Sequence, residues 1–191
     1  MSKQQRHFLL HKPYGYVSQF KHRERQRRNK KLLGDLFDFP PGTMAIGRLD
    51  KKSEGLLLLT TDGKVSERIR DKSVEKEYYV ELDGRITQQA IAQLAEGVHI
   101  RLTQGHYTTL PCLVQLLNPP PPLAQDRQVR GPSHGPTSWV AITLREGKYR
   151  QVRKMTAAVG FPTLRLVRVS VGRMQIGNLQ PGQVREVDEL L

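Results

Sequence analysis

The chain of 191 residues contains one cysteine, Cys112, and no long hydrophobic run. A single cysteine excludes an internal disulfide and is typical of a protein in the reducing cytoplasm. No apolar run approaches the length of a membrane-spanning helix, and the apolar stretch near the N-terminus is far too short for a signal peptide. These absences predict a cytoplasmic protein that does not cross a membrane.

Motifs for the common cofactors are also missing. There is no GxxxxGK[ST] loop for nucleotide phosphates and no GxGxxG motif after an expected strand. The six histidines are scattered and, with one cysteine, have no metal-ligand spacing. A catalytic serine elbow is absent as well. We therefore expect no cofactor and no metal, and any chemistry must use a carboxylate and basic groups.

Acidic residues are few. There are 31 Lys and Arg against 18 Asp and Glu, so the formal net charge is +13. Such a charge indicates a polyanionic partner, with nucleic acid first and an anionic membrane surface second. Residues 21–31 (KHRERQRRNKK) hold seven Lys or Arg and nothing apolar, so they are expected to form a mobile basic arm. Such an arm is either a solvated surface or a phosphate contact.

The apolar pattern predicts an α+β fold on a mixed, mostly antiparallel sheet with flanking helices. The length suits one domain over residues 1–191. Residues 118–137 hold six of the twelve prolines and are expected to form a long loop, either functional or disordered. Strands are expected at residues 8–10, 56–59, 76–82, 107–117, 138–145 and 163–171, and residues 14–17 are expected to turn into a second short strand. Helices are expected at residues 32–37 (or a turn), at 63–70 with Asp62 as the cap, and at 149–159. A further helix is expected to begin after the cap Thr87, with Ile91, Leu94 and Ala95 facing inward.

The most informative stretch is residues 45–63 (AIGRLDKKSEGLLLLTTDG), a charged loop between two apolar segments. Rigid scaffolds often present functional side chains on such loops. Asp50 is surrounded in sequence by Arg48, Lys51 and Lys52, and nearby positive charge favours the ionised carboxylate. Taken alone, the pattern is more typical of a polar hairpin loop in which the acid caps a turn.

GRLD followed by SEGLLLLTTDG resembles the signature of bacterial ribosomal RNA pseudouridine synthases, in the family of the small-subunit synthase A. The resemblance implies that Asp50 is catalytic and that the substrate is a uridine of ribosomal RNA, in particular 23S rRNA. It also implies a long sheet with helices at its sides and a basic cleft across its middle. Uridine isomerisation suits the composition because it needs no cofactor.

Three later segments carry the same resemblance. Residues 76–78 (KEY) imply that Tyr78 stacks on the target base, and residues 146–155 (EGKYRQVRKM) imply that Arg153 is the basic partner of the catalytic acid. Residues 160–168 (GFPTLRLVR) imply that Leu166 packs against the uracil. Without the resemblance, Tyr78 and Leu166 are ordinary core residues and Arg153 is a surface arginine.

The expected RNA contacts are basic. By resemblance, Arg48 fills the gap left by the flipped base; its alternative is a local salt bridge. A small N-terminal RNA-binding domain is common among the relatives and is not expected here, so the arm and the cleft must hold the RNA. Residues 163–171 are expected to expose one basic face. The remaining predicted contacts are Arg23, Arg25, Arg27, Arg28, Arg150, Lys154, Arg165 and Arg168.

Two other functional classes fit parts of the sequence. A non-catalytic RNA-binding or ribosome-assembly protein fits the composition equally well, but it has no use for the set Asp50, Tyr78 and Arg153. A metal-dependent nuclease needs a cluster of acidic residues to hold its metal, and this sequence lacks such a cluster. The prediction is therefore a monomeric, cofactor-free RNA pseudouridine synthase that acts on ribosomal RNA.

Changing Arg23, Arg25, Arg27 and Arg28 together to Ser tests the arm. Each lost phosphate contact flattens the plot of log affinity against log salt concentration by about 0.7–0.9, so we expect the slope to fall by roughly 2–4. Turnover at saturating RNA should change little. Affinities measured at several salt concentrations check this, and an unchanged slope would make the arm a solvated surface only.

Overall fold

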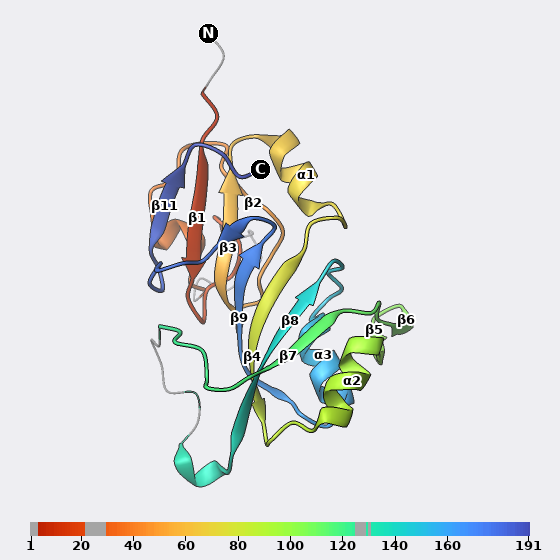
Figure 1. Ribbon diagram of the computed structural model, residues 1–191. Coiled ribbons are helices and arrows are strands. Elements are labelled where there is room, and N and C mark those ends of the chain that lie inside the picture. Colours follow the sequence, from red (N-terminus) through yellow and green to blue (C-terminus); the bar gives the residue numbers. More distant parts are fainter. Residues whose placement is uncertain (1–3, 22–29, 125–128, 130) are drawn as a thin grey trace. The chain divides into compact units, whose positions relative to one another are not determined.

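The structure is a computed structural model that describes residues 4–21, 30–124, 129 and 131–191. The chain divides into two compact units, which we describe separately. Unit 1 comprises residues 1–74 and 168–191, and unit 2 comprises residues 75–167. Strand β9 (Thr163–Val171) runs from unit 2 into unit 1, so its last residues are part of the first unit (Figure 1).

Unit 1 is built on two fully buried strands, β1 (His7–Lys12) and β3 (Glu54–Thr60), which pair antiparallel. Because the Leu56–Leu59 run is buried on both faces, it forms the centre of the sheet, as the unbroken apolar pattern predicts. The strand order is β11-β1-β3-β9, with β2 paired to β3 and β10 to β9. The remaining bounds are β2 (Met44–Ala45), β10 (Met174–Gln175) and β11 (Val184–Val187).

The helices of unit 1 are short. η1 (Leu33–Asp35) is a single 3₁₀ turn, and α1 (Gly63–Arg70) begins after Asp62, whose carboxylate accepts from the amides of Lys64 and Val65 at 2.8 and 3.4 Å. This N-cap confirms the expected helix start. Among the described residues, no helix of either unit has the length and apolar character needed to cross a membrane.

Of the turn into a second short strand expected at residues 14–17, the turn is present and the strand is wrong. Tyr16 forms only one isolated bridge, to Lys31, and Val17 donates to the Lys31 carbonyl at 3.0 Å. The chain turns at Gly15, which has a φ of 88° and so adopts a conformation that favours glycine. The same contacts show that Lys31, at the end of the expected arm, is held against the body of unit 1.

Unit 2 has the strand order β9-β4-β8-β7, and β8 pairs antiparallel with both neighbours β4 and β7. A separate hairpin joins two further strands, β5 and β6. The strands are β4 (Lys76–Asp83), β5 (His99–Leu102), β6 (Gly105–Thr108), β7 (Leu113–Leu117) and β8 (Thr137–Leu144); the helices are α2 (Gln88–Glu96), η2 (Pro132–His134) and α3 (Gln151–Ala158).

The core of unit 2 lies between its sheet and helices α2 and α3. Val80 of β4 and Ile142 of β8 pack with Leu94 of α2 and with Val152 and Met155 of α3. Figure 1 shows both helices on the same side of strands β4, β7 and β8. The apolar side chains that alternate along β4 and β8 therefore face the helices. The predicted α+β class is confirmed.

One expected strand of unit 2 is wrong. Residues 107–117 form no single strand, because β6 ends at Thr108 and β7 begins at Leu113, in a different sheet. Pro111 lies in the break and has no amide proton for a ladder. The hairpin β5–β6 was missed, although Gly105, with a φ of 120°, follows a two-residue turn of polar residues that is a recognisable hairpin signal.

Candidate active site

Asp50 lies on the loop between β2 and β3 of unit 1, as the sequence predicts, and its side chain is half-buried. Residues before and after it are held by main-chain hydrogen bonds. The Leu49 amide donates to Ser18 Oγ at 3.0 Å, and Ser18 Oγ donates to the Leu49 carbonyl at 2.9 Å. The Ser53 amide donates to the Asp50 carbonyl at 2.9 Å. These bonds close the loop around Asp50.

Two further bonds attach this loop to neighbouring segments. The Ile46 amide donates to the Leu58 carbonyl at 2.8 Å, and the Gly15 amide donates to the Lys51 carbonyl at 2.8 Å. The Ile46 and Leu49 side chains are buried. Apolar anchors and main-chain bonds together give the loop a defined shape, and it leaves Arg48, Lys51 and Lys52 exposed.

Sequence reasoning missed the buried charges beside this loop. Lys12, with no exposed surface, donates from Nζ to the carbonyls of Pro13 at 2.9 Å and Tyr16 at 2.8 Å. Burial lowers the pKa of Lys12 to about 8, opposed by the carboxylates of Glu54 and Asp50. A lysine at the end of an apolar strand was the available signal. The electrostatic surroundings of Asp50 thus include a buried cation as well as the exposed ones.

The exposed basic face expected on β9 is wrong. Arg168, in unit 1, is only 5% exposed and donates from Nε to the Leu56 carbonyl at 2.8 Å. Arg165, in unit 2, is 2% exposed and donates from Nη2 to the Ala124 carbonyl at 2.7 Å. Both guanidinium groups are hydrogen-bonded to main-chain carbonyls, which allows them to be buried. Their contact with RNA stays a prediction.

In unit 2, the two residues predicted to hold the base belong to one cluster. Tyr78 of β4 is partly buried against the core of this unit, to which the buried Leu166 of β9 also belongs. Alternation along β4 places Tyr79 on the opposite face, as expected. Burial raises the pKa of the Tyr79 hydroxyl, and the negative charge of Glu77 raises it further. The structure thus brings Tyr78 and Leu166 together and separates Tyr79 from them.

Helix α3 carries the predicted basic residues of unit 2. Arg153 is half-buried and donates from Nη1 to the Thr163 carbonyl at 3.4 Å, a long bond that joins α3 to the start of β9. Lys154 donates from Nζ to the Arg101 carbonyl at 2.8 Å. Arg150, immediately before the helix, has a φ of 52°. A non-glycine residue in this region is strained, which is common at functional sites.

A buried acid, Glu146, organises the turn before α3, and sequence reasoning gave it no role. Its carboxylate accepts from the Tyr107 hydroxyl at 2.5 Å, the Leu110 amide at 2.8 Å and Gln151 Nε2 at 2.6 Å. The bond to Glu146 raises the pKa of Tyr107. Three donors stabilise the buried carboxylate. Through them Glu146 joins the start of α3 to strand β6, which contains Tyr107, and to Leu110. Glu146 is the first residue of the segment that carries the resemblance around Arg153.

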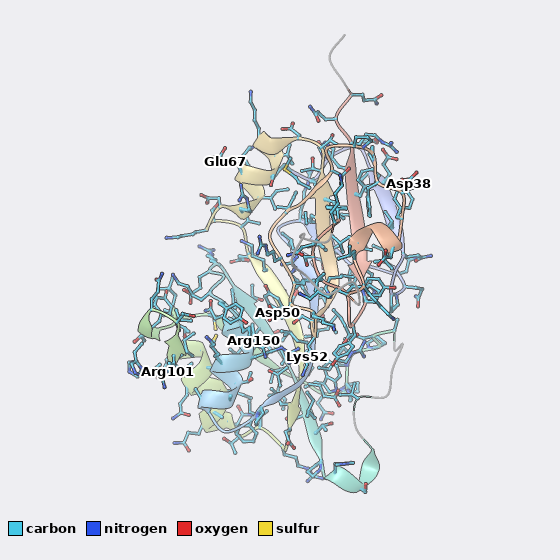
Figure 2. All side chains as sticks on the ribbon, turned by 180° about the vertical axis from the view of Figure 1, so that it is seen from behind. Asp38, Asp50, Lys52, Glu67, Arg101 and Arg150 are labelled. Carbon is cyan, nitrogen blue, oxygen red and sulfur yellow. The ribbon has the colours of Figure 1, made fainter. Side chains whose placement is uncertain are left out.

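The structure therefore places Arg48, Asp50 and Arg168 in unit 1, and Tyr78, Arg150, Arg153, Lys154, Arg165 and Leu166 in unit 2. Figure 2 labels Asp50 and Arg150 among them. The pair Asp50 and Arg153, and the basic cleft, stay predictions. The predicted contacts Arg23, Arg25, Arg27 and Arg28 lie outside the described residues.

This arrangement is the fold of a pseudouridylate synthase. A crystal structure with that title superposes with a TM-score of 0.75 at 28% identity, covering 96% of this chain and 70% of the other. The human RNA pseudouridylate synthase domain containing 1 shares the fold at a TM-score of 0.56 and 16% identity, covering 98% of this chain and 80% of the other.

Residues 6–158 match the RNA pseudouridylate synthase family, and the chain belongs to it. The matched range includes Asp50, Tyr78 and Arg153, whereas Leu166 lies beyond it. The chain is 43% identical over 183 residues to the ribosomal large subunit pseudouridine synthase E of Xanthomonas campestris, covering 94% of each protein. It is 40% identical to the enzyme of the same name from Vibrio parahaemolyticus, covering 94% of this chain and 72% of that one.

Lys12→Met tests the buried cation. The lysine pKa is about 8 in the folded protein against 10.5 normally, so the unfolded chain binds more protons between these values and stability rises with pH there. The quantity to follow is the difference between the unfolding free energies of the wild type and of the variant. We expect this difference to shift in favour of the wild type by about 3 kcal/mol between pH 7 and a pH above 10.5. Urea unfolding across this range checks it, and parallel curves would contradict it.

Proposed function

We propose that the protein converts a specific uridine of ribosomal RNA to pseudouridine, in 23S rRNA of the large subunit. The observation that carries this proposal is the family match that spans residues 6–158, together with the anchored loop on which Asp50 lies half-buried. The names of the two bacterial relatives support a large-subunit substrate. The protein acts as a monomer in the cytoplasm, where its RNA is assembled into ribosomes.

The reaction is balanced without a cofactor. The bond between the ribose C1′ and the uracil N1 breaks, the base turns, and C1′ bonds to C5 instead. N1 gains a proton and C5 loses one, so no oxidant or reductant is consumed. Asp50 acts at the sugar of the flipped-out nucleotide, as nucleophile or as base. Arg153 is its basic partner, which keeps the carboxylate charged in a closed site.

The other proposed roles concern the flipped nucleotide. Extruding a base from its stack costs a few kcal/mol, which an aromatic ring in the protein partly offsets. Tyr78 supplies that ring and Leu166 an apolar wall, and their common cluster in unit 2 supports this pairing of roles. Arg48, exposed on the Asp50 loop, fills the gap left in the RNA.

Asp50→Asn should reduce pseudouridine formation by at least on the order of 10²-fold. RNA affinity should stay close to that of the wild type, because one neutralised acid removes no phosphate contact. Mapping of pseudouridine in ribosomal RNA incubated with each purified variant measures its activity. Filter binding measures its RNA affinity. A matched control is Asp38→Asn, which removes the same charge from an exposed position of unit 1 away from Asp50 in Figure 2.

Wild-type turnover by the Asn variant would exclude Asp50 as the catalyst. If the wild type itself forms no pseudouridine but binds the RNA, the protein belongs with the non-catalytic RNA-binding class.

Tyr78→Phe keeps the ring and should retain base stacking, whereas Tyr78→Ala should lose on the order of 1–3 kcal/mol of transition-state stabilisation. Steady-state kinetics of pseudouridine formation measure both. The neighbouring Tyr79→Phe and Tyr79→Ala variants are the matched controls, because Tyr79 is half-buried on the other face of β4. Equal activity of the two Tyr78 variants would contradict the stacking role, and urea unfolding separates lost stacking from lost stability.

A further inference from the structure

Tyr149 is an aromatic side chain that no role described above uses, and it is 67% exposed. It lies in unit 2, immediately before Arg150 and α3. Among the described residues, Phe37 is the other large aromatic side chain exposed by more than a third, and it packs against Phe8 and Phe39. Tyr149 therefore has an unusually accessible ring for this protein.

The turn that carries Tyr149 is held on both sides. The Gln151 amide donates to the Lys148 carbonyl at 3.1 Å, which makes Tyr149 and Arg150 the two central residues of the turn. The Lys148 amide donates to Gln151 Oε1 at 2.9 Å, and Gln151 Nε2 donates to the buried Glu146. Since the turn is fixed by backbone and side-chain bonds, the ring is presented from a rigid base and loses little entropy on binding.

A lysine lies over this ring, and two more cations belong to the segments beside it. Lys154 Nζ lies 5.2 Å from the centre of the Tyr149 ring and is fixed by its bond to the Arg101 carbonyl. Lys148 Nζ lies 4.6 Å from the centre of the Tyr107 ring. Lys148 and Arg101 are exposed, and Figure 2 labels Arg101 and Arg150 in this unit. Glu146, three residues before Tyr149, is buried and accepts three hydrogen bonds, whereas Lys148 beside Tyr149 is exposed and positively charged.

We propose that Tyr149 is a stacking platform for an unpaired RNA base other than the target uridine, with Arg101, Lys148 and Lys154 contacting the adjoining phosphates. An accessible aromatic ring beside cations is the arrangement by which proteins bind single-stranded RNA without reading its sequence. The proposal rests on the proposed function only in taking RNA as the substrate. It adds a second point of contact, separate from Tyr78, that favours single-stranded flanks around the modified site.

The test compares the affinity of variants for a short oligouridine and for a blunt RNA duplex with no unpaired base. Tyr149→Ala should weaken binding to the oligouridine about 5- to 150-fold, the range expected for one stacked base, and leave the duplex unaffected. Tyr149→Phe should bind as the wild type does. The matched control is Leu113→Ala, which truncates an equally exposed side chain of unit 2 and should change nothing.

Salt dependence separates stacking from charge. Stacking releases no counterions, so Tyr149→Ala should keep the wild-type slope of log affinity against log salt, whereas Arg101→Ser and Lys148→Ser should each lower it by about 0.7. The platform is overturned if Tyr149→Ala binds oligouridine as the wild type does, if it loses the duplex equally, or if Tyr149→Phe loses as much.

These results are independent of catalysis. If the wild type binds oligouridine through Tyr149 yet forms no pseudouridine in ribosomal RNA, the proposed function fails and the platform stands. If pseudouridine forms and Tyr149→Ala leaves oligouridine affinity unchanged, the platform fails and the proposed function stands.

Discussion

The position of Asp50 depends on hydrogen bonds made by the backbone around it. Leu49 is bound to Ser18 through both its amide and its carbonyl, and the Lys51 carbonyl accepts from the Gly15 amide. The hydroxyl of Ser18, the main-chain bonds and the buried Leu49 side chain therefore anchor the segment on which Asp50 lies. The acid proposed to be catalytic thereby has a defined position, while the side chains of Arg48, Lys51 and Lys52 are exposed to solvent.

Both units bury charged groups, and two of these groups join parts of the chain that are distant in sequence. In unit 1, Arg168 of β9 donates to the Leu56 carbonyl of β3, and in unit 2 Glu146 accepts from Tyr107, Leu110 and Gln151. Removing such groups from water is costly unless hydrogen bonds compensate for the lost hydration. Among the described residues, Arg168 Nη2 is buried without a hydrogen-bond partner, so the compensation of Arg168 is incomplete. The attachment of β9 to β3 in unit 1 and the turn before α3 in unit 2 therefore depend on hydrogen bonds that a change of one partner would disrupt.

Local rules predicted much of the secondary structure. The alternation of β4 and the unbroken apolar run of β3 were read from the sequence, and Asp62 and Thr87 were correctly expected as helix caps. These features depend on side-chain period and on capping within a few residues. The expected strand over residues 107–117 failed because its two halves pair with different partners, β5 and β8, and no pattern within the segment contains that information.

The sequence by itself determined the family and the identity of the candidate residues, since GRLD, KEY and EGKYRQVRKM are contiguous motifs. Only the tertiary structure decided which of them are buried and what they contact. Arg165 and Arg168 of β9 suggested an exposed face, yet both are buried. Lys12, at the end of β1, lies close enough to the Asp50 loop for the Asp50 charge to act on it. Burial and charge proximity arise from the pairing of segments far apart in the chain, so no local pattern encodes them.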